Sequence, residues 1–106
     1  MKLALVIHSD DPETVWNAFR LGVFALKEGD AVTVFLLGRG VEAERLDTER
    51  FPVTEQIQKF VHGGGAILAC GTCLEARGKG GTDVCPVSTM ADLHRLVTGA
   101  DRVLTF

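Results

Sequence analysis

The sequence predicts an α/β protein built on a mostly parallel sheet of four to five strands, with helices on both faces of the sheet. Short apolar runs of strand length alternate with segments in which apolar residues recur at helical spacing. Strand, helix and strand in that order form βαβ units, in which a helix joins two parallel strands. The chain has 106 residues with no linker or repeat, so we expect one domain over residues 1–106.

The first strand and helix have the clearest boundaries. Residues 2–8 form an almost continuous apolar run, as in a strand that is covered on both faces. Asp11 can cap the free amides of the next helix, Pro12 fits its first position, and Glu13 complements its dipole. The helical spacing then continues to Gly29, where we expect the helix to end.

The middle of the chain repeats this pattern with a polar insertion. Residues 31–37 predict a second strand, which the glycine-containing turn at residues 38–40 ends. Residues 41–50 are polar and charged and indicate a surface loop or a short helix. From Pro52 a helix is expected up to the glycine run at residues 63–65, because its apolar residues lie on one side.

The last third contains shorter elements. Residues 66–69 predict a third strand that leads directly into a helix over residues 70–77. Residues 82–85 can form a short fourth strand. A capping box opens a helix over residues 89–98, and residues 102–106 form the final strand.

Composition and charge exclude several classes of function. The net charge is −3 and no basic stripe is present, so nucleic-acid binding has little electrostatic support. The apolar runs are much shorter than the roughly 20 residues that a membrane-spanning helix needs. The opening run stops at His8 without a cleavage pattern, so it indicates a strand and not a signal peptide, and we expect a cytoplasmic protein.

The chain contains three cysteines, Cys70, Cys73 and Cys85. Cytoplasmic thiols are normally reduced, and an odd number leaves at least one cysteine without an intramolecular partner. A structural disulfide framework is therefore not expected. We interpret Cys85 as a packed residue, with a resolving thiol as the alternative.

Polar and reactive side chains follow the first three strands. His8 follows the first strand, Arg39 the second, and Cys70 with Cys73 the third. Ligands of open parallel sheets bind at the carboxyl ends of the strands, so these residues are candidates for a binding or reactive site. If the second strand lies between the other two, His8 and Cys70 are about 10 Å apart, which is two strand spacings.

Cys70 is the strongest candidate for a reactive residue. It stands where a strand becomes a helix, so free amides and the helix dipole are expected to lower the pKa of its thiol and to present an accessible thiolate. Gly71 leaves the backbone open to approach, Thr72 offers a hydroxyl, and Cys73 lies one turn further on nearly the same face. A lone cysteine is more often a packing residue, but two at this spacing favour a functional role.

His8 and Arg39 are candidate substrate-binding residues, each with a second interpretation. His8 could deprotonate a thiol, although a capping or hydrogen-bonding role is the more common one. Arg39 could attract an anionic substrate, or it could be an exposed loop arginine.

The segment Ala69–Gly78, with the pattern Cys-x-x-Cys-x-x-x-Arg-Gly, resembles the cysteine segment of DsrE-like proteins. The segments Ser88–Leu93 and Ala100–Phe106 resemble the same family, so the likeness covers nearly the whole chain. It implies a three-layer α/β/α sandwich, a variant of the flavodoxin arrangement. It also implies that Cys70 carries sulfur as a persulfide, and that the chain forms trimers or hexamers, or hetero-oligomers with paralogues. The relay subunits of this family have one cysteine in this segment, so Cys73 departs from the family pattern.

Three functions remain open on these grounds. The leading hypothesis is a sulfur carrier or sulfurtransferase in which Cys70 takes sulfur from a donor protein and passes it to an acceptor protein, without a metal or organic cofactor. The second is a thiol–disulfide redox protein that uses Cys70 and Cys73, and the third is a non-catalytic subunit of a sulfur-transfer complex. A zinc site is the weakest option, because a fourth ligand would have to come from a distant histidine or another chain.

Overall fold

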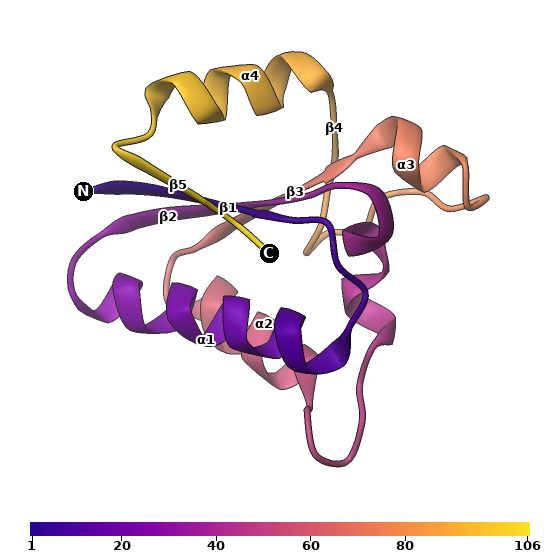
Figure 1. The fold of residues 1–106 in the computed structure, drawn as a ribbon, viewed down its shortest axis with the longest axis horizontal. Coiled ribbons are helices and arrows are strands. Elements are labelled where there is room, and N and C mark those ends of the chain that lie inside the picture. Colours follow the sequence, from indigo (N-terminus) through magenta and orange to yellow (C-terminus); the bar gives the residue numbers. More distant parts are fainter.

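A computed structural model describes all of residues 1–106 and shows a five-stranded, all-parallel sheet between layers of helices (Figure 1). The strand order is β4-β3-β2-β1-β5. The predicted fold class is therefore confirmed, and β2 lies between β1 and β3 as the site argument required. The strands are β1 Lys2–Ile7, β2 Ala31–Leu36, β3 Ala66–Cys70, β4 Val87–Ser88 and β5 Arg102–Thr105.

The helices divide between the two faces and the carboxyl edge of the sheet (Figure 1). α1 (Pro12–Lys27) and α2 (Val53–His62) cover one face, and α4 (Met90–Gly99) covers the other. The 3₁₀ helix η1 (Gly38–Arg45) and the short helix α3 (Gly71–Glu75) follow β2 and β3. None of these helices has the length and apolar character needed to cross a membrane.

Two buried phenylalanines fix the packing of α1 against α2. The ring centroids of Phe19 and Phe60 are 5.6 Å apart in an edge-to-face arrangement, which is favourable for aromatic rings. Gly22 on α1 makes this approach possible, because a Cβ there would lie 2.9 Å from the Phe60 ring. This face of the sheet is therefore closely packed.

The opposite face is covered much more lightly. No residue of α4 is buried, and every residue of β5 is exposed. Val103 and Leu104, neighbours in β5 whose side chains point to opposite faces, expose 37% and 40% of their surface, which is unusual for apolar side chains in a parallel sheet. The edge strand β5 is therefore open on both faces.

Three predicted boundaries are wrong. Residues 82–85 form a turn and not the fourth strand, because the Thr82 hydroxyl accepts the Cys85 backbone N–H and the Cys85 carbonyl accepts the Thr82 N–H. The fourth strand lies instead at Val87–Ser88. α3 ends at Glu75, earlier than the predicted residue 77, and η1 begins inside the predicted turn, at Gly38.

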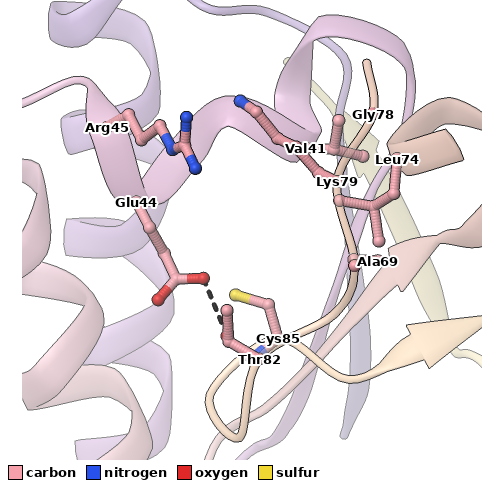
Figure 2. A pocket seen from close by; sticks show the side chains of 10 residues that line it. Val41, Glu44, Arg45, Ala69, Leu74, Gly78, Lys79, Thr82 and Cys85 are labelled. Atoms are coloured by element: carbon pink, nitrogen blue, oxygen red, sulfur yellow. Dashed lines mark hydrogen bonds between the residues drawn. The ribbon is translucent and has the colours of Figure 1, made fainter. Parts of the chain in front are cut away.

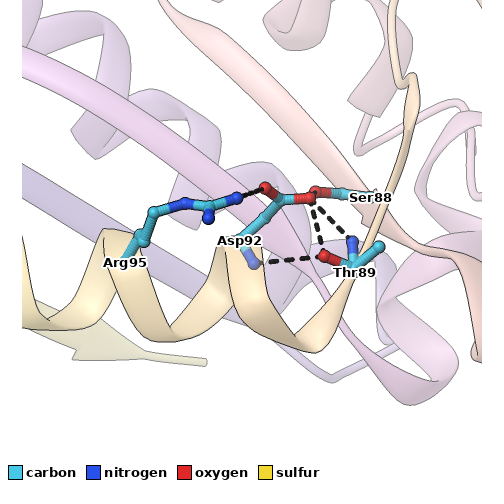
Figure 3. A network of polar contacts seen from close by, with 4 residues as sticks. All are labelled: Ser88, Thr89, Asp92 and Arg95. Carbon is cyan, nitrogen blue, oxygen red and sulfur yellow. Dashed lines mark hydrogen bonds and ion pairs between the residues drawn. The ribbon is translucent and has the colours of Figure 1, made fainter.

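Asp92 ties α4 to the end of β4 (Figure 3). Its Oδ2 accepts hydrogen bonds from Ser88 Oγ at 2.7 Å and from the Thr89 backbone N–H at 2.9 Å. Thr89 Oγ1 accepts the Asp92 backbone N–H at 3.2 Å, which completes the predicted capping box, and Arg95 pairs with the other carboxylate oxygen. Ser88 is the one buried polar residue of the chain. This network therefore fixes where α4 begins above β4.

The Asp92 network predicts how stability depends on pH. The Ser88 hydroxyl, followed by Thr89 and Arg95, lowers the pKa of the Asp92 carboxyl far below its ordinary value. Because the unfolded value is about 3.9, the network stabilises the fold above that pH and this stabilisation is lost as the pH falls further. We expect Asp92→Asn to lower the melting temperature at neutral pH and to lose less stability than wild type on acidification. Circular dichroism melts over a pH series test this, with Asp83→Asn as an exposed control; identical pH curves for Asp92→Asn and wild type would contradict it.

Candidate functional site at the carboxyl edge of the sheet

Cys70 is the last residue of β3 and is buried, with 4% of its surface exposed. It pairs in register with Ser88 of β4, so the two side chains lie on the same face of the sheet. That face is the one covered by α4, since Ser88 is hydrogen bonded to Asp92. The expectation of an accessible Cys70 is therefore wrong for the single chain.

The electrostatics of Cys70 also differ from the prediction. The backbone amides of Cys73 and Thr72 do donate to its sulfur and lower its pKa, as expected at the start of a helix. Burial has the larger effect and raises the pKa of Cys70, and the hydrogen bond and charge of the Cys73 side chain raise it further. α3 has only five residues, so its dipole does not compensate for the loss of water around the sulfur. Cys70 is therefore a protonated thiol at neutral pH.

Cys73 is the more accessible thiol of the pair, because its side chain is only partly buried. Its sulfur accepts a hydrogen bond from the backbone N–H of Gly38 at 3.2 Å. Its carbonyl oxygen accepts a hydrogen bond from Arg77 at 3.0 Å, within the same turn of chain. The side chain of Cys73, one helical turn away, also raises the pKa of the Cys70 thiol. The two thiols therefore form one connected unit, with Cys73 on its outer side.

Two glycines shape the turn that supplies the Gly38 amide. Gly38 has a φ of +57°, in the region that favours glycine. Gly40 packs directly against the end of β1, because a Cβ there would lie only 2.0 Å from the Ile7 carbonyl oxygen. The turn after β2 is therefore held close to the sheet, with the Gly38 amide directed at Cys73.

Arg77 and Glu42 hold α3 and the following loop against η1. The Arg77 Nε lies 3.6 Å from the Glu42 carboxylate, and Lys79 pairs with the same group. The hydrogen bond from Lys79 makes the largest contribution to a lowered pKa of the Glu42 carboxyl. These charged contacts link the element that carries Cys73 to the element that begins with Gly38.

The structure brings some of the predicted site residues to the thiol pair and leaves others apart. Gly71 lies tightly against β4, where a Cβ would be 3.1 Å from Val87, and Thr72 contributes its amide to Cys70. Arg39 is exposed in the turn next to Gly38, on the same side as Cys73. His8 is also exposed, but it follows β1, and β2 separates it from β3.

A cavity of about 270 Å³ lies between η1 and the loop that joins α3 to β4 (Figure 2). Cys85 is buried in its wall, and the Glu44 carboxylate faces it while accepting a hydrogen bond from Thr82 at 2.8 Å. Burial, followed by the charge and hydrogen bond of Glu44, raises the pKa of Cys85 to about 12. Neither Cys70 nor Cys73 lines this cavity. The third cysteine is therefore a protonated thiol outside the pair.

Sequence reasoning missed two groups at the site, the Gly38 amide and the Ser88 hydroxyl. The turn at residues 38–40 was expected at the same sheet edge as the cysteine pair, but Arg39 was its only named candidate and the Gly38 amide was not considered. Ser88 was missed because the fourth strand was expected at residues 82–85. A glycine-bounded turn after a neighbouring parallel strand is the signal that could have found the first group.

A family model of DsrE/DsrF-like proteins matches residues 1–106, the full length described. The chain belongs to the DsrE/DsrF-like family. The match includes the cysteine pair and both ends of the sheet, as the resemblance of the separate segments implied. Membership in the DsrE/DsrF-like family suggests a role in sulfur relay.

Relatives of this DsrE/DsrF-like chain include uncharacterised archaeal proteins. The protein MJ0989 of Methanocaldococcus jannaschii is 33% identical over 100 residues, which cover 89% of this chain and 88% of that protein. The protein MK0008 of Methanopyrus kandleri is 31% identical over 110 residues, with 95% and 91% covered. A solved structure with the same fold is that of BT1422, a conserved protein of unknown function from Bacteroides thetaiotaomicron. It superposes with a TM-score of 0.78 at 23% sequence identity, and the match covers 99% of this chain and 94% of that chain.

The three thiols are expected to differ in their reaction with an alkylating reagent. Cys73 is partly exposed, whereas Cys70 and Cys85 are buried and have raised pKa values. We expect iodoacetamide at mildly alkaline pH to modify Cys73 at least about ten times faster than Cys70. The thiolate is the reactive form, and burial of Cys70 both disfavours its thiolate and blocks the reagent. Cys85 should react only after unfolding. Peptide mass spectrometry over a time course measures the three rates, and equal rates in the folded protein would contradict the structure of the site.

Proposed function

We propose that the protein is a sulfur carrier that holds sulfur as a persulfide on Cys70 and passes it to an acceptor protein. The observation that carries this proposal is the connected thiol pair at the carboxyl edge of a DsrE/DsrF-like sheet. Cys70 occupies the position in the Cys-x-x-Cys-x-x-x-Arg-Gly segment that the family resemblance assigns to the sulfur-bearing cysteine. No metal or organic cofactor enters this chemistry.

Burial of Cys70 suits the storage of a persulfide. A persulfide exposed to water is readily attacked by other thiols, and solvent exclusion slows such side reactions. The amides of Thr72 and Cys73, at the start of α3, favour a charged sulfur at Cys70. The site therefore combines protection from solvent with polar backbone groups near the sulfur.

Delivery of the sulfur needs no oxidant. A thiolate of the acceptor protein attacks the outer sulfur of the Cys70 persulfide, the sulfur–sulfur bond breaks, and Cys70 leaves as a thiolate. The acceptor then carries the persulfide. Cys70 regains a proton from solvent, since its raised pKa favours the protonated form.

The exposed helix α4 and edge strand β5 support an assembly with other chains. Proteins of this family typically form oligomers. α4 has no buried residue, and Val103 and Leu104 of β5 stay exposed in the single chain, whereas parallel sheets are normally covered on both faces. We propose a homo-oligomer, a trimer or hexamer, or a hetero-oligomer with paralogues. The proposal places the protein in the cytoplasm, where its thiols stay reduced.

A second candidate function is thiol–disulfide exchange by Cys70 and Cys73. The spacing of the two cysteines favours it, because they lie one helical turn apart at the start of α3. In that case the pair cycles between two thiols and one disulfide and gains no sulfur. A non-catalytic subunit of a sulfur-transfer complex would show neither reaction.

Intact-protein mass spectrometry after incubation with a low-molecular-weight persulfide donor separates these functions. We expect wild type to gain one sulfur atom, located on Cys70 by peptide analysis, and Cys70→Ala to fail to keep sulfur at that position. Cys85→Ala is the matched control and should gain sulfur like wild type, because Cys85 lies outside the pair. Loss of two hydrogens without gained sulfur indicates a disulfide protein, and an unchanged mass rules out both reactions.

A further inference from the structure

We infer that sulfur reaches this protein on Cys73 and then moves to Cys70, and that the backbone amide of Gly38 is the group that positions the Cys73 sulfur. This division of roles rests on the proposed sulfur-carrier function and deepens it. The family resemblance gives no role to Cys73, since the relay subunits have one cysteine in this segment. The inference comes from the contacts of the pair.

Accessibility separates the two thiols. A donor persulfide must bring its outer sulfur into bonding contact with the attacking sulfur. Cys70 exposes only 4% of its surface, whereas Cys73 is partly exposed at the edge of the sheet. A macromolecular donor can therefore meet Cys73 without rearrangement of the core, and it cannot meet Cys70 in the same way.

The Gly38 amide gives Cys73 a fixed donor of a hydrogen bond. The N–H lies 3.2 Å from the sulfur, within the range for a hydrogen bond to sulfur. This contact holds the Cys73 sulfur in one place at the edge of the sheet. Arg39, the residue after Gly38, is exposed at the same turn and can attract an anionic donor group.

The direction of this amide is set by the fold and not by the cysteine. Gly38 has a positive φ, and Gly40 holds the turn against the Ile7 carbonyl oxygen, where no side chain fits. The Gly40 amide also donates to the Leu37 carbonyl oxygen at 2.9 Å. The Gly38 amide is therefore preorganised, and the turn does not have to rearrange as charge develops on the Cys73 sulfur.

The first step forms one sulfur–sulfur bond and breaks another. The Cys73 thiolate attacks the outer sulfur of a donor persulfide, and the donor leaves as a thiolate. The outer sulfur keeps its proton, so Cys73 now bears a persulfide. No electrons are gained or lost overall.

The second step moves the same sulfur inward. Cys70 gives its thiol proton to the inner sulfur of the Cys73 persulfide, which lies one helical turn away at the start of α3. The Cys70 sulfur bonds to the outer sulfur, the bond from that sulfur to Cys73 breaks, and Cys73 is left as a thiol. One persulfide and one thiol are present before and after, so the step is balanced without a co-reactant.

The rate at which each cysteine gains sulfur tests this order. The probe is cysteine persulfide, and peptide mass spectrometry follows its sulfur on wild type, Cys70→Ala, Cys73→Ala and the control Cys85→Ala, all checked for folding by circular dichroism. We expect Cys70 of the Cys73→Ala variant to gain sulfur at least about ten times more slowly than Cys70 of wild type, because the accessible thiol is gone. We expect Cys70→Ala to accumulate sulfur on Cys73, and Cys85→Ala to behave like wild type.

A second measurement follows the Gly38 amide directly. The amide proton of Gly38 in a ¹⁵N-labelled Cys70→Ala protein should shift when Cys73 becomes a persulfide, and it should not shift in Cys73→Ala. This readout depends on the contact with the sulfur and not on stability.

The two proposals fail in distinguishable ways. If wild type gains no sulfur on either cysteine, the sulfur-carrier function itself is wrong. If wild type gains sulfur but Cys73→Ala loads Cys70 at the wild-type rate, or Cys70→Ala never carries sulfur on Cys73, the carrier function stands and the order of transfer is wrong. An unchanged Gly38 amide in the loaded Cys70→Ala protein overturns the role of that amide.

Discussion

The hydrogen bond from the Gly38 amide to the Cys73 sulfur depends on the register of a parallel sheet. β2 and β3 pair from Thr33 opposite Ala66 to Leu36 opposite Ala69, so both strands leave the sheet at the same level. The turn that follows β2 and the helix that follows β3 therefore meet at one edge. A slip of one residue would displace the sulfur by about 3.3 Å along the strand and reverse the side-chain directions, which would break the contact.

The thiol pair shows how burial and local amides compete. Amides at the start of α3 do approach the Cys70 sulfur, and each of them favours the thiolate. The same sulfur is buried at the end of β3. There the free-energy cost of removing a charge from water outweighs the gain from a few hydrogen bonds. Cys73 is one turn further along and lies outside this environment, with an amide from a different strand–helix connection. Two chemically identical groups thus acquire different properties from a separation of one helical turn.

Much of the fold could be predicted from residues 2–70, because the patterns there are long and have clear ends. The capping residues at the start of α1 and the apolar runs of the first three strands determine those elements locally. The short β4 could not be predicted, since a two-residue strand has no pattern of its own and exists only because Val87 and Ser88 pair with β3. The candidate site was predicted as a set of residues, but the sign of the pKa shift at Cys70 was not. That sign depends on the burial of the sulfur in the folded chain, and no local feature of the Cys-x-x-Cys segment predicts this burial.

The helix on the face of the sheet that carries Cys70 has little packing of its own. α4 lies over the face that carries Cys70, yet no residue of this helix is buried. Its position above β4 comes from the Asp92 carboxylate and its hydrogen bonds to Ser88 and Thr89. Water can replace hydrogen bonds of this kind at little net cost in free energy. It cannot replace the close packing of Phe19 against Phe60 on the other face. The two faces of the sheet are therefore held in different ways: closely packed aromatic rings fix α1 and α2, and a hydrogen-bonded cap fixes the start of α4.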